Sequence, residues 1–232
     1  MNSGNRRAEL GSRDRKIIDD AIRLRILTND AIQRLHLPEA MNNATVKVTA
    51  RLVRTGWLKQ HGLDGRKQYF VAGPKTIRAF GLPVSRSRPL GPQSLATRIA
   101  ILDYIVSTKP RLRLLLDREV NTLIAGATTQ HRAMPHLVEL GNPDCPIRLL
   151  RIDLGGAPSH VAKKLGDDVR KRQSHSAYSK LIAKSNLILV VVTTTPTKKK
   201  LIETEIVKRT WPKGIRFNVT VVPSLSAYLG AS

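Results

Sequence analysis

The chain is poor in cysteine and in long apolar runs. Cys145 is the only cysteine among 232 residues, so no disulfide can form within the chain, and no group of Cys and His has the spacing of a structural zinc site. The longest apolar run, LILVVV at 187–192, is far shorter than the roughly 20 residues that cross a bilayer. The first 16 residues lack the apolar segment of a signal peptide. We therefore expect a cytoplasmic protein without a membrane partner.

Acidic residues are scarce as well. Seventeen Asp and Glu stand against 40 Lys and Arg, which gives a formal net charge of +23. Basic and acidic residues number 16 and 7 in residues 1–80, 8 and 4 in 81–140, and 16 and 6 in 141–232. The excess positive charge is thus spread over the chain and favours a globular protein that binds a polyanion. An aromatic content of 4% argues against a stacking platform for single strands, so we expect double-stranded DNA as the partner.

Residues 13–82 have the pattern of three helices and a hairpin. Apolar residues recur at helical spacing from Arg13, and Thr28 or Asn29 can cap a second, short helix. Asn42 or Asn43 can cap a third helix, which Gly56 ends. Two short strand-like runs then meet at Asp64-Gly65, a dipeptide that suits a tight turn. The order of these elements resembles that of winged helix-turn-helix proteins.

The third helix and the hairpin contain the candidate DNA-binding residues. Four polar side chains of the third helix follow one another at steps of four, four and three residues, which places them on one stripe. The resemblance implies that this stripe faces the major groove and that the hairpin, as the wing, contacts phosphates or the minor groove. The predicted DNA-binding residues are Asn43, Lys47, Arg51 and Arg54 on the helix and Lys59, Arg66 and Lys67 on the hairpin.

A second domain is expected from residue 94 to residue 232. Residues 83–93 contain several Pro, Gly and Ser and few apolar residues, which is typical of a linker. A helix with an apolar stripe follows, and it either begins the second core or pairs with its twin in a homodimer. From residue 134 strands alternate with helices: MPHLVEL and IRLLRIDL flank a turn, and NLILVVVTTT and FNVTVVP are separated by a helix that starts near Pro196. This pattern predicts an α/β sandwich on one mixed sheet.

The hairpin at 134–153 has the spacing of a metal-dependent nuclease motif. Pro143-Asp144 and the stretch ending in Asp153 suggest carboxylates on neighbouring strands that could hold a divalent cation. Asn142, Pro143 and Asp144 are turn formers, however, so Asp144 is expected in the loop and away from the middle of the sheet. A turn centred near Pro143 places Arg151 opposite Pro135 or His136, and Pro135-His136 then replaces Pro143-Asp144 as the dipeptide of interest.

A winged helix, a linker and an α/β domain with this hairpin resemble the replication-relaxation proteins of plasmids and other mobile elements. The second domain of that family is similar to a restriction-endonuclease-like core, with Pro-Asp on the first hairpin strand and Glu-x-Asp-x-Gly on the second. The matching positions here are His136, Arg151 and Asp153, and only Asp153 retains an acid. Arg151 has a fixed positive charge where a dication would lie. We expect a degenerate site with no metal, no cofactor and no catalytic residues.

Together these observations predict a DNA-binding protein that acts in replication, mobilisation or transcriptional control of a mobile element, the process being implied by the resemblance alone. Two alternatives remain. The chain could be a divergent metal-dependent nuclease or nicking subunit, in which Asp153 is joined by an acid such as Glu119 or Glu139. It could also be a scaffold that binds replication or transfer proteins.

Overall fold

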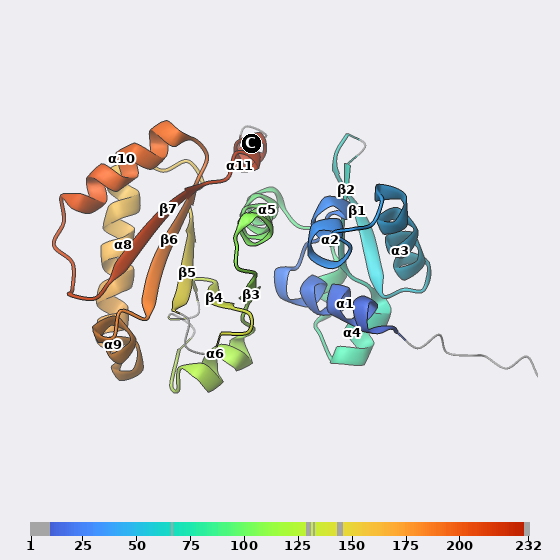
Figure 1. The fold of residues 1–232 in the computed structure, drawn as a ribbon, viewed down its shortest axis with the longest axis horizontal. Helices are drawn as coiled ribbons and strands as arrows, with labels where there is room; N and C mark the ends of the chain where they lie inside the picture. The colour runs from blue at the N-terminus through green and yellow to red at the C-terminus, as the bar shows by residue number, and fades with distance from the viewer. Residues whose placement is uncertain (1–9, 66, 129–130, 132, 143–145, 230–232) are drawn as a thin grey trace, which may run out of the picture. The chain divides into compact units, whose positions relative to one another are not determined.

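The computed structural model describes residues 10–65, 67–128, 131, 133–142 and 146–229. The chain divides into two compact units, Met1–Pro89 and Leu90–Ser232, called here the N-terminal and C-terminal units. Figure 1 shows the helices and hairpin of the first unit and the five-stranded sheet of the second. The protein is therefore a mixed α/β structure with two sheets, and each unit is described by itself.

The N-terminal unit begins with three helices. They are α1 (Ser12–Leu24), α2 (Asn29–His36) and α3 (Asn42–Arg54). The Thr28 hydroxyl accepts from the Ala31 amide and caps α2 as predicted. The predicted asparagine cap of α3 was wrong, because Met41 occupies the N-cap position, where its side chain makes no capping hydrogen bond. Gly56 has φ +77° just after α3, the left-handed conformation that ends helices.

A two-stranded hairpin and a short segment complete this unit. Strands β1 (Leu58–Asp64) and β2 (Lys67–Ala72) pair antiparallel, and a bridge between Leu27 and Phe70 attaches β2 to the α1–α2 connection. Helix α4 (Pro74–Phe80) and the 3-10 helix η1 (Val84–Ser87) follow. Ser87 is buried, and its carbonyl lies 3.0 Å from Nε2 of His61 on β1. Half of the predicted linker 83–93 therefore packs on the N-terminal unit.

The C-terminal unit is built on one mixed sheet. Its strands lie in the order β3 (Leu112–Leu114), β4 (His136–Glu139), β5 (Ile147–Ile152), β6 (Leu187–Thr193) and β7 (Arg216–Val221). The first three strands are antiparallel and the last three are parallel. Parallel neighbours need crossover helices, which explains why helices separate β5 from β6 and β6 from β7.

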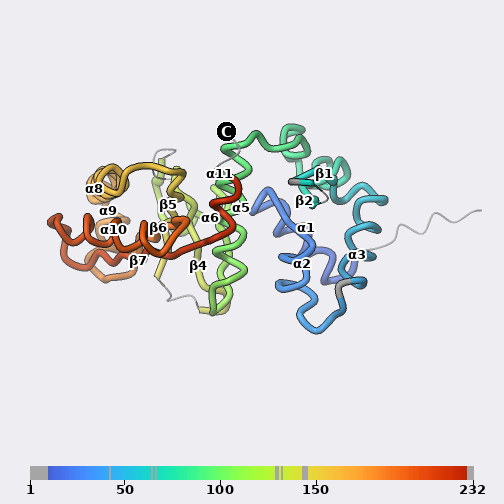
Figure 2. Tube along the Cα trace, turned by 90° about the horizontal axis from the view of Figure 1, so that it is seen from above, coloured from blue at the N-terminus to red at the C-terminus, as the bar shows by residue number. Residues whose placement is uncertain are grey.

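Helices cover both faces of this sheet. Helices α8 (Pro158–Gln173), α9 (Ser176–Ala183) and α10 (Pro196–Val207) cover one face, and α5 (Pro92–Ser107) with α11 (Ser224–Leu229) covers the other (Figure 2). The short helix α6 (Asp117–Leu123) follows β3. Residues of β5 and β6 alternate between the two faces, and Leu149, Leu189 and Val191 join α8–α10 in the core. The predicted α/β sandwich on a mixed sheet is confirmed.

The register of the β4–β5 hairpin differs from the prediction. His136 lies opposite Leu149, so Arg151 lies beyond the paired residues and not opposite Pro135 or His136. The centre of an antiparallel turn sets the register, and an error of one residue in that centre moves every pair by two. Pro143 and Asp144 lie outside the described residues. Among the described helices, none is both long and apolar enough to cross a membrane.

Candidate nucleic-acid interface

The outward face of α3 has two exposed cations. Thr45, Val48, Thr49 and Leu52 are buried on one side of the helix. The opposite side exposes Asn43, Val46, Lys47, Ala50 and Arg54, and each of them lies three or four residues from at least one other on this side. Lys47 and Arg54 make no ion pair with any residue that the structure describes. Their charges are therefore available to a polyanion.

Arg51 lies at the edge of this face and is held by α1. Its Nη2 donates to both carboxylate oxygens of Asp14, at 2.9 and 2.8 Å. The Asp14 side chain is 7% exposed and that of Arg51 is 39% exposed. A carboxylate buried to this degree needs a partner, and Arg51 supplies it. Arg51 therefore differs from the other predicted residues of α3, because its ion pair connects α3 to the first turn of α1.

The hairpin supplies two further exposed cations. Lys59 on β1 and Lys67 on β2 are exposed, while Tyr69 and Phe70 on β2 are buried against the helices. Neither lysine has an ion pair to the described part of the chain. Strand β1 packs beside α3, so the hairpin and α3 belong to the same compact unit. Arg66, the remaining predicted wing residue, lies outside the described residues.

His136, the first predicted position of the degenerate metal site, is buried under α9. Its Nδ1 lies 2.8 Å from the Met134 carbonyl and its Nε2 lies 2.6 Å from the Tyr178 hydroxyl. A carbonyl only accepts, so the neutral ring donates from Nδ1 and accepts from Tyr178 at Nε2. Burial lowers the pKa of His136 from 6.5 to about 4, and the Arg172 cation adds to the shift. Both ring nitrogens are thus already engaged.

Arg151, the second position, points to α8. Its Nε donates to Asp168 at 3.0 Å, and its Nη2 contacts the same carboxylate oxygen. Arg172 lies 3.8 Å from the other oxygen of Asp168 and is itself buried. Two arginines thus share one carboxylate, which leaves a net positive charge beside the end of β5. This charge opposes binding of a dication there.

Asp153, the third position, has three partners of its own. Its side chain is completely buried and accepts from the Thr193 hydroxyl at 2.8 Å and from the Gly155 amide at 3.1 Å. The Lys198 ammonium, on the first turn of α10, lies 2.8 Å from Oδ2. The sequence did not indicate Lys198 as a partner, because 45 positions separate it from Asp153. The two residues come together because β5 and β6 are adjacent strands of the sheet.

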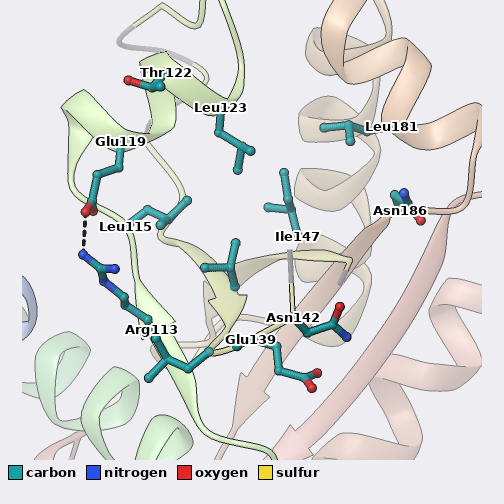
Figure 3. Close-up of a pocket in the computed structure, with 13 residues that line it drawn as sticks. Arg113, Leu115, Glu119, Thr122, Leu123, Glu139, Asn142, Ile147, Leu181 and Asn186 are labelled. Atoms are coloured by element: carbon teal, nitrogen blue, oxygen red, sulfur yellow. Dashed lines mark hydrogen bonds and ion pairs between the residues drawn. The ribbon is translucent and has the colours of Figure 1, made fainter. Parts of the chain in front are cut away.

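The acids considered for a divergent nuclease lie at the other end of β5. Figure 3 shows Glu119, paired with Arg113 at 2.7 Å, and Glu139 on the wall of a cavity of about 780 Å³ that Ile147 also lines. Ile147 and Asp153 are six strand positions apart, roughly 20 Å. Neither glutamate can share a metal with Asp153 across that distance. In the described ranges, no three His, Cys, Asp or Glu side chains are grouped as metal ligands.

Comparisons with protein-family models, curated proteins and solved structures found no match to this chain. The interface is therefore interpreted from its own residues.

Proposed function

We propose that the protein binds double-stranded DNA through its N-terminal unit, which acts as a winged helix-turn-helix. The observation that carries the proposal is a set of exposed cations on α3 and the hairpin that have no ion pair within the described part of the chain, Lys47, Arg54, Lys59 and Lys67. An α-helix fits the major groove of B-DNA, and cations on an adjoining hairpin can reach phosphates. The three-helix and hairpin order supports this docking, with Asn43 at the start of the exposed helix face.

The C-terminal unit is, in this proposal, a restriction-endonuclease-like domain without catalytic activity. Its support is the order of a helix, three antiparallel strands, and then two further parallel strands connected by crossover helices. The three positions of the degenerate metal site each have a different direct partner, since His136 contacts Tyr178, Arg151 contacts Asp168 and Asp153 contacts Lys198. The protein would then act in replication, mobilisation or transcriptional control of a plasmid or other mobile element, together with replication or transfer proteins.

Binding of the full chain to duplex DNA at several salt concentrations tests the proposal. A variant with Lys47→Ala and Arg54→Ala is compared with a matched variant that carries Lys200→Ala and Lys213→Ala, two exposed lysines of the C-terminal unit. We expect the first variant to bind at least about tenfold more weakly than the wild type, since charge-assisted hydrogen bonds contribute about 1.5–3 kcal/mol each. The control variant should retain most of the affinity.

Three results would contradict the proposal. Affinity that does not change with salt, or that survives in the Lys47 and Arg54 variant, would favour the protein scaffold instead. Cleavage of plasmid DNA with magnesium that is lost in Asp153→Ala would favour the nuclease.

A further inference from the structure

The exposed face of α3 contains apolar side chains between its polar ones. Val46 is 50% exposed, and Ala50 is exposed one turn later. Asn43 and Lys47 lie beside Val46, and Arg54 lies beyond Ala50 on the same face. Phosphates are bound by cations and hydrogen-bond donors, so a face that only held the DNA backbone would gain nothing from a valine in its centre. Base edges, by contrast, offer both polar and apolar partners.

The dimensions of the helix divide this face into two parts. At about 1.5 Å per residue, Asn43 and Ala50 lie roughly 10.5 Å apart along the axis, within the ~12 Å width of the major groove. Arg54 lies roughly 16.5 Å from Asn43 and so extends past the bases to the phosphates. Asn43 and Val46 are about 4.5 Å apart along the axis, close to the ~3.4 Å step between base pairs.

Three other polar residues of α3 with described side chains, Thr45, Thr49 and Arg51, are not available to contact bases. Arg51 is fixed by the carboxylate of Asp14. The hydroxyl of Thr49 donates within the unit, at 3.1 Å to Oδ1 of Asn29, and Thr45 is buried. Among the α3 side chains that the structure describes, the possible contacts to base edges are thus confined to Asn43, Val46, Lys47 and Ala50.

From this geometry we propose that α3 reads adjacent A·T base pairs. The Asn43 amide pairs with N6 and N7 of an adenine, and the Val46 methyls pack on the C5-methyl of a neighbouring thymine, the group by which the major groove distinguishes thymine. Arg54 holds the phosphate beyond the site. The inference rests on the proposed DNA binding and adds to it the class of sequence and the residues that select it.

Replacing thymine with deoxyuracil distinguishes base readout from backbone binding, because the two nucleotides differ only in the C5-methyl group of the base. A preferred duplex is first selected from random sequences with the full chain, and each thymine in it is then replaced by deoxyuracil. For the wild type we expect affinity to fall about fourfold at one thymine, which corresponds to one buried methyl group. Val46→Ala should remove most of this difference at that thymine.

Two further variants sharpen the test. Val207→Ala changes a valine that is 83% exposed on α10, and it should leave the thymine preference unchanged. For the wild type, 7-deazaadenine in place of the adenine removes N7, and we expect a loss of about fivefold or more. Asn43→Ala should be insensitive to the same replacement.

Failure of the proposed A·T readout can be distinguished from failure of the proposed DNA binding. If the protein binds duplexes in a salt-dependent way but selects no sequence, or if Val46→Ala discriminates thymine from deoxyuracil as the wild type does, the readout is overturned and DNA binding stands. If no salt-dependent binding to duplex DNA is found, both the readout and the proposed function fall.

Discussion

Arg51 and Arg54 lie three residues apart on α3, and the structure predicts that they contribute differently to DNA binding. Arg54 is exposed and has no ion pair among the described residues, whereas Arg51 is paired with the buried Asp14. The informative variant neutralises the whole pair, with Asp14→Asn and Arg51→Gln together. It keeps the local net charge and leaves two amides that can still hydrogen-bond. It is compared with Arg54→Gln alone.

The expected magnitudes follow from counterion release. Each phosphate neutralised contributes about 0.9 to the slope of log affinity against log salt, so the four exposed cations Lys47, Arg54, Lys59 and Lys67 account for a slope of about −3.6. Arg54→Gln should reduce its magnitude by about 0.9, and the double Asp14 and Arg51 variant should leave it unchanged. Arg51→Gln alone would remove the nearer cation from the buried Asp14 carboxylate, leave Arg13 Nε at 4.0 Å from it, and cost about 2–3 kcal/mol of stability, so it is not a clean test.

The assay is equilibrium binding to a labelled duplex over a range of KCl concentrations. Circular dichroism checks that each variant is folded, and Lys213→Gln is the control for loss of a single exposed charge in the C-terminal unit. If the double variant flattens the salt dependence as much as Arg54→Gln does, Arg51 contacts phosphate in the complex and the reasoning from its pairing is refuted.

Three further predictions concern stability. The pKa of His136 is about 4 in the folded protein against 6.5 when the ring is exposed, so the unfolded state binds a proton more readily. The unfolding free energy of the C-terminal unit should therefore fall by up to about 3 kcal/mol as the pH falls from 6.5 to 4. Denaturant titrations should show no such decrease above pH 7. Lys198→Met should lower the unfolding free energy by about 3 kcal/mol, and adding Asp153→Asn should restore most of it; no recovery would mean that the pair is not coupled. Gly73→Ala places a Cβ 2.4 Å from the Gly56 carbonyl oxygen, so it should unfold the N-terminal unit and abolish DNA binding. Gly62 has open space around it, so Gly62→Ala should leave both the unfolding free energy and the DNA affinity unchanged.

Local sequence signals predicted much of the fold. The periodicity from Arg13, the cap at Thr28 and the Asp64-Gly65 turn gave the helices and hairpin of the N-terminal unit, because each signal acts within a few residues. Strand β3 and helix α6 were not predicted. They have three and seven residues, too few for a periodic pattern to emerge.

The roles of single residues were harder to predict than the elements. Spacing alone placed Arg51 on the same stripe as Lys47 and Arg54, but its partner Asp14 comes from another helix 37 positions away. Val46 was not part of the predicted interface, which was defined by polar side chains at helical spacing, and it is 50% exposed on the same face. The exposure of a side chain depends on what packs against it, and that is a property of the tertiary structure.

The contact between Lys198 and Asp153 has a consequence for how the C-terminal unit responds to its surroundings. A carboxylate at the end of a buried strand requires a cation, and here the chain provides one on the next helix. A cation attached to the chain cannot be diluted, chelated or exchanged, so its occupancy is set by folding and not by the ionic composition of the solution. We therefore expect the unfolding midpoint of this unit to be the same in EDTA and in magnesium.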